Sequence, residues 1–525
     1  MADQNTRTQP MMRLLPVWLF LFLVVTTATS SHAADVSPLV ISRLIDQRLG
    51  SDTTNQSQFA DDAEFLRRVT LDLAGRIPTI VEVHDYLSNT SESRRIEAID
   101  RLLHSGVYYR NMATFWRRAW VPQADTPEFD TITADFERWL VHRLQKGTRY
   151  DELVVEILTL DHDNNVQAST TPVGFYDANL SKPENLAASA TRAFLGINLD
   201  CAQCHDHPFS RWTREQFWQT AAFFAQPHTN EKSQPPKVRI PDTKKEYEPA
   251  LLTKTKIEWP QKLDSVSLRL ILVDWMRANE EQLLAKNAVN RLWAHYFGEA
   301  IIEPVDDLSR DEVQTGERAQ LLNDLSAAFI ASGYDLDMMT EGIVSSNAYR
   351  LSSSPQSTNK GSKPDPDAPG PFRITRATVR GLTGEQLYDS LLTAASLPSE
   401  RSDVGSGGSE RSQRSEFASR FYIENSFSAE RSISQALTLM NGSFVNELTT
   451  KQGNLMLASI LSSPFMSSDE QIDTVFIAAL GRHARDAELK VVKQSFDSYT
   501  NTTRESHLGN LFWVLINSSE FNTNH

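Results

Sequence analysis

Apolar residues recur at helical spacing over most of the 525-residue chain. In the segment 94–103, Ile96, Ile99, Leu102 and Leu103 fall on one side of a helix, because residues three or four positions apart share a face. The same spacing predicts helices over residues 135–144, 150–160, 266–297, 318–331, 336–351, 384–395, 471–480 and 506–521. The pattern therefore predicts a mainly α-helical protein.

Three polar pairs mark predicted helix starts. In a capping box, the side chain of Ser or Thr and that of Glu or Gln three residues later satisfy each other's free backbone N–H groups. The spacing occurs in Thr79 with Glu82, Ser181 with Glu184, and Thr213 with Gln216. The last two pairs predict helices on either side of the only two cysteines of the chain.

A Pro- and Lys-rich stretch at 233–262 interrupts the helical pattern. It holds the best strand candidates of the chain, residues 237–240 and 256–259. We expect this stretch to be a small irregular or β connection between two helical domains, 34–232 and 263–525.

Two segments of the second domain lack apolar residues. Residues 352–371 are rich in Ser, Pro, Gly, Lys and Asp, and residues 398–414 repeat Ser, Gly, Arg and Glu. Such segments bury too little apolar surface to offset their chain entropy. Both are predicted to be disordered, mobile loops.

Residues 1–33 have the pattern of a secretory signal peptide. Arg7 and Arg13 form a basic region, an apolar run of about 15 residues follows, and Ser31-His32-Ala33 supplies a small-x-small cleavage site. The run is shorter than the roughly 20 residues that span a bilayer as a helix. We expect an exported, periplasmic or extracytoplasmic protein with no transmembrane segment after signal cleavage.

The formal net charge of the chain is −15 at pH 7, and removal of Asp3, Arg7 and Arg13 with the signal peptide makes it more negative. A nucleic-acid-binding surface needs clustered Lys and Arg to displace counterions from phosphates. Nucleic acid is therefore excluded as an expected partner.

The two cysteines lie three positions apart in Cys201-Ala202-Gln203-Cys204-His205. This C-x-x-C-H spacing is the attachment signature of a c-type haem. Each thiol can add to one vinyl group of the haem, and the adjacent imidazole can bind the iron as an axial ligand. The motif predicts a covalent haem c on Cys201 and Cys204, with His205 as the iron ligand.

Aromatic residues surround this motif in the sequence, and they have two interpretations. They line a dry haem crevice, or they belong to the ordinary hydrophobic core. The set is Phe194, Phe209, Trp212, Phe217, Trp218, Phe223 and Phe224. His207 is too close in sequence to reach the opposite face of the same ring, so a sixth ligand has to come from elsewhere. By residue type the candidates are His228, His295, Met440 and His525.

Three alternatives use the same residues. Cys201, Cys204, His205 and His207 can together supply a zinc site, although four ligands within seven residues have little freedom to surround a metal. A dithiol redox centre needs a thioredoxin-like βαβ setting, which the helical pattern does not offer. The third alternative is a local disulfide without a cofactor.

Acidic residues gather at a second place in the sequence. Glu303, Asp306 and Asp307 follow the segment that contains His295. They can bind a cation or act with His295 in acid–base chemistry. Capping of turns and helix starts is the more common role of such residues.

The motifs together resemble a paired-domain family of planctomycete bacteria. The first half resembles its cytochrome-like domain (PSCyt type) and the second half its companion domain of unknown function (PSD type). The resemblance rests on residues 65–73, 75–78, 184–187 and 201–209 in the first half, and on residues 289–295, 303–308, 331–334 and 515–521 in the second.

The resemblance implies an exported protein without an assigned activity, so no catalytic residue is transferred. Many family members carry an additional cytochrome c-like domain, which we do not find between Asp35 and Phe65. A separate protein would therefore have to donate or accept electrons. The leading hypothesis is an exported haem c protein of a periplasmic redox or electron-transfer process. The alternative is an extracytoplasmic scaffold or binding protein without a cofactor or held together by zinc, whose C-terminal domain binds another protein or a polysaccharide.

Overall fold

A computed structural model describes residues 36–50, 56–125, 130–161, 170–226, 234–261, 263–308, 315–354, 372–398, 413–421, 432–496 and 501–525. The predicted signal peptide lies outside the described residues, and so does most of the two predicted mobile loops. Among the described residues, no helix is both long enough and apolar enough to cross a membrane.

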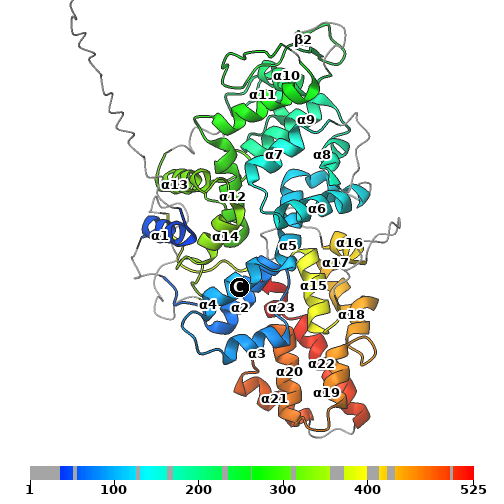
Figure 1. The fold of residues 1–525 in the computed structure, drawn as a ribbon. Helices are drawn as coiled ribbons and strands as arrows, with labels where there is room; N and C mark the ends of the chain where they lie inside the picture. Colours follow the sequence, from blue (N-terminus) through cyan, green and yellow to red (C-terminus); the bar gives the residue numbers. More distant parts are fainter. Residues whose placement is uncertain are drawn as a thin grey trace, which may run out of the picture. The chain divides into compact units, whose positions relative to one another are not determined.

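The first half of the chain is largely helical (Figure 1). They are α1 (Pro38–Leu49), α2 (Asp62–Ala74), α3 (Ile80–Ser88), α4 (Arg94–Leu103), α5 (Gly106–Trp120), α6 (Asp130–Gln145), α7 (Tyr150–Leu158), α8 (Val173–Ala178), α9 (Pro183–Ala190) and α10 (Arg214–Ala221). A π-helical turn, Thr191–Leu195, extends α9, and a 3-10 turn, Asp200–Gln203, follows it.

The second half is also helical. It contains α11 (Ser265–Ala278), α12 (Leu283–Phe297), α13 (Glu317–Ala331), α14 (Leu336–Val344), α15 (Gly384–Ala394), α16 (Gln413–Arg420), α17 (Ile433–Asn441), α18 (Ser443–Leu448), α19 (Leu455–Ser462), α20 (Ser468–Leu480), α21 (Asp486–Phe496), α22 (Asn501–Ile516) and α23 (Ser519–Asn522). The prediction of a mainly α-helical protein is confirmed.

Two long helical predictions are divided in the structure. The predicted helix 266–297 is interrupted between α11 and α12, where Gln282 has a left-handed backbone (φ 54°). The predicted helix 506–521 ends at Ile516 and restarts at Ser519. Apolar spacing continues through both breaks, so periodicity alone does not reveal them.

Two of the three predicted capping boxes are confirmed. Thr79 caps α3 with Glu82, and Thr213 caps α10 with Gln216. The box at Ser181 is wrong, because α9 begins at Pro183 and has no side-chain cap. Ser181 instead has a left-handed backbone (φ 51°), and its N–H donates to the carbonyl of Tyr176.

The strands are short. β1 (Val238–Arg239) pairs antiparallel with β2 (Glu246–Tyr247), which confirms the strand predicted at 237–240. The strand predicted at 256–259 is wrong: these residues have no ladder partner, and Ile257 and Trp259 pack against the hydrophobic core instead. A second ladder joins β3 (Arg380–Gly381) to β4 (Thr523–Asn524) at the end of the chain.

The hydrophobic core consists of two clusters. The larger draws on residues 41–349, on both sides of the 233–262 connection, and also includes Ile477. The smaller is made by residues 382–521 together with Leu71 and Ile77. Helix α2 supplies residues to both clusters. The predicted domain boundaries, 34–232 and 263–525, stay a prediction.

Candidate functional site

The C-x-x-C-H segment lies between the π-helical turn and α10. Cys201 belongs to the 3-10 turn Asp200–Gln203, and Cys204 follows it. Two contacts hold the turn: the N–H of Ala202 donates to the carbonyl of Leu199 (2.8 Å), and the indole of Trp218 donates to the carbonyl of Gln203 (3.1 Å). Ala202 is fully buried, and it anchors the turn between the two thiols.

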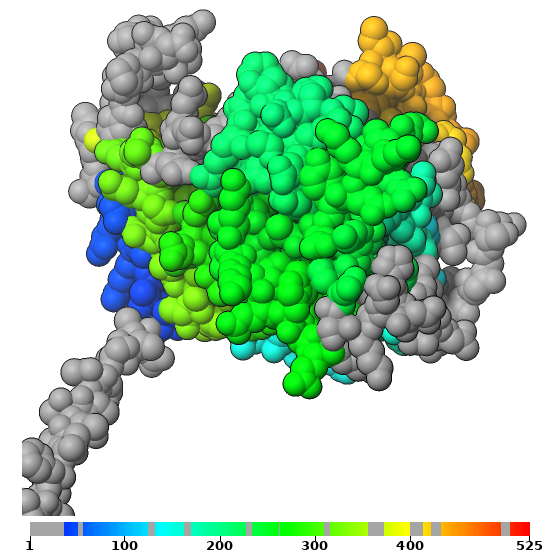
Figure 2. All heavy atoms as spheres, turned by 90° about the horizontal axis from the view of Figure 1, so that it is seen from above, coloured from blue at the N-terminus to red at the C-terminus, as the bar shows by residue number. Residues whose placement is uncertain are grey.

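Both cysteines are free and exposed. Their side chains therefore point away from the core, although free cysteine is among the residue types most often buried. Residues of about 200–300, the part of the chain that contains the motif, fill the centre of the view in Figure 2. The thiols are accessible to a reagent or a ligand from solvent.

His205 is also exposed, and one of its ring nitrogens is engaged. Its Nδ1 lies 2.8 Å from the carbonyl oxygen of Asp206, which can only accept, so this nitrogen carries the proton. In the neutral imidazole the lone pair is then on Nε2, which makes no hydrogen bond with the described residues. An imidazole held in this tautomer is ready to bind a metal through Nε2.

His207 and Asp206 fix the backbone after the motif. Nδ1 of His207 accepts from the N–H of Phe209 (3.2 Å), and the N–H of His207 donates to the carbonyl of Trp212 (2.8 Å). Oδ1 of Asp206 accepts from the N–H of Arg214, the first residue of α10 (2.8 Å). The bond of Asp206 connects the motif to the start of α10. The bond from Phe209 engages Nδ1 of His207 within its own loop.

The aromatic residues around the motif belong mainly to the core and do not line a crevice. Six of the seven are buried members of the larger core cluster, and Phe209 is 83% exposed. The buried six are Phe194, Trp212, Phe217, Trp218, Phe223 and Phe224. Of the two interpretations, the structure favours ordinary core packing.

The four residues of the zinc alternative are not gathered around a point. Among the described residues, no three His, Cys, Asp or Glu side chains are arranged to hold a metal ion. The backbone explains this, because His207 turns its Nδ1 toward the N–H of Phe209.

The candidates for a sixth haem ligand have separate environments. His295 contacts Phe115 and the main chain of Asp72, Met440 is 44% exposed on α17, and His525 ends the chain beside Arg68. His228 lies outside the described residues. The contacts of His295, Met440 and His525 do not include residues of the cysteine motif.

The acidic residues after α12 do not form a site with His295. Glu303 accepts from the N–H of Ala300 (2.8 Å), which is a local capping contact. The N–H of Asp307 closes a turn on the carbonyl of Pro304. His295 Nε2 instead lies 3.3 Å from the carbonyl oxygen of Asp72. The structure favours the turn-capping interpretation of these acids.

A cavity of about 230 Å³ lies away from the cysteines, and sequence analysis did not anticipate it. Its lining comes from α5, α12, the start of α15, α16 and the end of the chain; the ionisable members are Arg118, Arg291, His295, Arg380, Glu385 and Arg414. These residues are far apart in sequence, so no local spacing could have revealed the site.

Asp72 and Arg380 form the ionic centre beside this cavity. The Asp72 carboxylate is fully buried and lies 2.8 Å from the Arg380 guanidinium. It also accepts from the hydroxyl of Tyr349 and the side-chain amide of Asn524, each at 2.7 Å. His295, whose carbonyl accepts from Arg380, faces the cavity. Burial lowers the pKa of His295 to about 4, so the ring is neutral at pH 7.

Comparison with known families gives two matches. Residues 40–229 match PSCyt2, described as a protein of unknown function (DUF1549), and residues 268–418 match PSD1, described as a protein of unknown function (DUF1553). The chain therefore contains a PSCyt2 region followed by a PSD1 region. The arrangement predicted from the motifs is confirmed, and the name PSCyt2 suggests a cytochrome-like role without showing one. No curated protein and no solved structure matches the chain.

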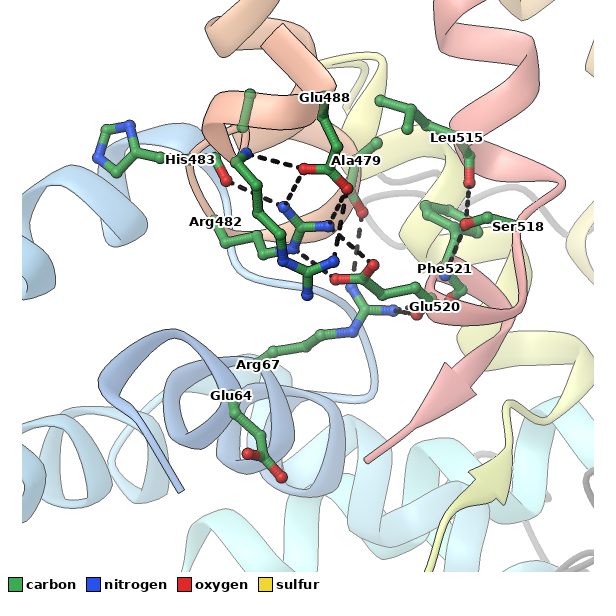
Figure 3. Close-up of polar contacts among 12 residues, drawn as sticks. Glu64, Arg67, Ala479, Arg482, His483, Glu488, Leu515, Ser518, Glu520 and Phe521 are labelled. Atoms are coloured by element: carbon green, nitrogen blue, oxygen red, sulfur yellow. Dashed lines mark hydrogen bonds and ion pairs between the residues drawn. The ribbon is translucent and has the colours of Figure 1, made fainter. Parts of the chain in front are cut away.

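The charged residues of the first PSCyt2 motif are buried in the interior. Arg67 on α2 is 1% exposed, and its Nη2 donates to the carbonyls of Glu520 (2.9 Å) and Phe521 (2.8 Å) (Figure 3). Above it, Arg482 pairs with the Glu520 carboxylate at 2.6 Å. The guanidinium of Arg67 therefore holds the C-terminal turn of the chain against α2.

Arg68, the next residue of the motif, holds a different segment. Its Nη1 donates to the carbonyls of Tyr349 (2.7 Å) and Leu351 (2.8 Å), and its Nη2 pairs with Glu64 (2.7 Å). The two arginines satisfy main-chain oxygens that a helix end or a turn leaves without partners. The arginines of the PSCyt2 motif on α2 thus connect segments that lie far apart in the sequence.

Polar side chains of α12 bind the main chain of two segments, one after α12 and one in the π-helical turn that follows α9. Asn290 exchanges two hydrogen bonds with the main chain of Ile302 (2.8 and 3.0 Å). Asn287 and Arg291 donate to the carbonyls of Ala193 (2.6 Å) and Arg192 (3.1 Å) in the π-helical turn. The PSD1 region therefore contacts the backbone that leads to the cysteine motif of the PSCyt2 region.

Proposed function

We propose that the PSCyt2 region carries a covalent haem c on Cys201 and Cys204 and takes part in redox chemistry after export. The observation that carries the proposal is the state of three adjacent side chains. Two thiols are free and exposed, and the neighbouring His205 directs its protonated Nδ1 to a carbonyl, which leaves Nε2 available for iron.

Attachment needs no other reactant at this site. Each thiol S–H adds across one vinyl C=C bond, so an S–C bond forms and the proton goes to the second vinyl carbon. Cys201 and Cys204 would hold the porphyrin and His205 would bind the iron, which supplies one-electron chemistry when bound. The fixed turn around Ala202 keeps the thiols on the surface side of the backbone.

The surroundings favour a haem with an exposed edge. Phe209 offers an exposed ring four residues from His205, while the other aromatic side chains are packed in the core. Solvent access stabilises the more charged oxidised iron, so a low reduction potential is expected. An exposed edge also suits exchange of electrons with a separate donor or acceptor protein.

The test is production of the whole chain, with its N-terminal segment, in a host that exports and matures c-type cytochromes. We expect a pyridine haemochrome spectrum of a c-type haem and a protein mass increased by one haem. Cys204→Ser should abolish attachment at both positions or leave a single thioether. His205→Gln should alter the iron-ligand spectrum, and the matched change His207→Gln should not.

One result would end the proposal. If the exported wild-type protein has the mass of the bare polypeptide and both thiols react with an alkylating agent, no haem is attached. Thiols that react only after reduction would instead support the local disulfide.

A further inference from the structure

The cavity beside Asp72 contains more positive than negative side chains. Three of its arginines each have a carboxylate partner: Arg118 with Glu385 (2.7 Å), Arg380 with Asp72 (2.8 Å) and Arg414 with Asp389 (2.9 Å). The fourth cavity arginine, Arg291, forms no ion pair with the described residues. The lining therefore has one arginine without a carboxylate in contact; burial lowers its pKa, and Asp306 raises it only from beyond ion-pair distance.

Arg291 is held by neutral groups. Its Nε donates to the side-chain oxygen of Asn287 and its Nη2 to the carbonyl of Arg192, both at 3.1 Å. In the described part of the chain, no carboxylate oxygen lies within 4 Å of its guanidinium and no hydrogen-bond partner faces its Nη1. The residue is only 9% exposed. Burying a charge without a counter-charge is costly, so this position favours an anion in the cavity.

A helix N-terminus opens onto the same cavity. α15 begins there, with Thr383 as its N-cap and with Thr383, Glu385 and Gln386 in the cavity lining. The partial positive charge of the first turn favours an anion, while the N–H of Gln386 already donates to Oγ1 of Thr383 (3.2 Å). Burial alone would raise the pKa of Glu385, but Arg118, Arg414 and Arg117 lower it to about 2. The arginines around Glu385 therefore outweigh burial and keep this carboxylate ionised.

We propose that this cavity binds the oxyanion group of a small solute, a carboxylate, phosphate or sulfate, with Arg291 as its principal cation. A planar guanidinium matches the paired oxygens of these groups. The size of the cavity, about 230 Å³, admits a small molecule and not a folded partner. Because Arg291 also contacts the carbonyl of Arg192, an occupant lies next to the backbone that leads to the cysteines. The proposal is independent of haem attachment.

The test is equilibrium dialysis of the whole chain against radiolabelled phosphate, sulfate and acetate, with chloride holding the ionic strength constant. We expect saturable binding of at least one of these anions with one equivalent per chain. Arg291→Gln should weaken that binding at least tenfold. The matched control is Arg239→Gln, which removes an exposed arginine paired with Glu246 on the β1–β2 ladder.

Arg291→Lys provides a comparison that keeps the charge. A lysine lacks the planar fork, so we expect a dissociation constant several-fold higher than that of the wild type. If Arg291→Gln does not fold by circular dichroism, Arg291→Lys decides the matter, and an unchanged dissociation constant overturns the proposal. It is also overturned if the wild type binds none of the three anions saturably, or if Arg291→Gln folds and binds as the wild type does.

Discussion

Two polar motifs of the PSCyt2 region lie in opposite environments, one in the interior of the protein and one on its surface. The motif on α2 places Arg67, Arg68 and Asp72 in the interior, where main-chain carbonyls and buried side chains use their hydrogen-bonding capacity. The cysteine motif places Cys201 and Cys204 on the surface, and neither thiol takes part in holding the fold.

Structural and reactive motifs of this protein differ in whether the chain itself supplies partners for their polar side chains. A charged side chain in the interior needs partners, and on α2 the chain itself supplies them. A reactive side chain without a partner inside the protein is available to an external group. The cysteine motif and the cavity at Arg291 have such capacity where a ligand can reach it, whereas the atoms of the α2 motif that lack a partner, Arg67 Nε and Thr70 Oγ1, are buried.

The largest effect is expected for Asp72→Asn. The change keeps the size of the side chain but leaves the buried Arg380 without its carboxylate. Removing one partner of a buried ion pair costs about 3–5 kcal/mol. We expect a fall of that size in the free energy of unfolding, measured by urea denaturation. The control Glu416→Gln, in an exposed pair with Arg420, should change it by less than about 1 kcal/mol. Equal effects of the two substitutions would contradict a structural role for Asp72.

A smaller effect is expected at the end of α2. Gly75 has a left-handed backbone (φ 68°), and a Cβ there would lie 2.5 Å from the side-chain oxygen of Asn111. The amide of Asn111 donates to the carbonyl of Asp72, so its displacement costs a hydrogen bond. We expect Gly75→Ala to lower the free energy of unfolding by about 2–3 kcal/mol, from backbone strain and that lost bond.

Gly147→Ala separates the two contributions. Gly147 also has a positive φ (66°), close to that of Gly75, but a Cβ there meets no atom within 4 Å. Backbone strain alone costs about 1–2 kcal/mol, so the control should fall below Gly75→Ala in the same denaturation experiment. If the control variant is destabilised as much as Gly75→Ala, the contact with Asn111 makes no measurable contribution.

His295 should make the stability of the buried region depend on pH. Its pKa in the folded protein is about 4, below the value near 6.5 in the unfolded chain. The unfolded state therefore binds more protons, and stability present above pH 6.5 is lost as pH falls toward 4. The expected loss is on the order of 2 kcal/mol, reduced because solvent reaches the ring through the cavity.

The measurement compares wild type with His295→Gln by urea denaturation at pH 7 and at pH 4.5. The stability difference between the two proteins should shift in favour of the variant at the lower pH. A difference that stays constant with pH would show that folding does not lower the pKa of His295.

The smallest effect on stability is expected at the cysteines. Because both thiols are exposed and free, Cys201→Ser and Cys204→Ser should change the free energy of unfolding of the haem-free chain by less than about 0.5 kcal/mol. A disulfide would instead predict a loss of about 2–3 kcal/mol for oxidised protein. Denaturation with and without a reductant distinguishes the two.

Much of the local structure could be predicted from the sequence because its causes are local. Apolar spacing located α4 and α15, and the Thr79 and Thr213 boxes set the starts of α3 and α10. The C-x-x-C-H spacing also needs no tertiary information to be recognised, and the two family matches confirm the order of the motifs. What the spacing could not tell was the exposure of the thiols or the tautomer of His205.

The helical class, several helix starts and the thiol pair beside an imidazole are readable from the amino-acid order, because each depends on residues within a few positions of one another. The long-range contacts of Arg67, Arg68 and Asp72 are visible only in the folded chain. The same is true of the position of Arg291 in a cavity without a carboxylate in contact. These contacts join residues up to several hundred positions apart. Contacts at such separations depend on how the whole chain packs, and they cannot be predicted from a local sequence pattern.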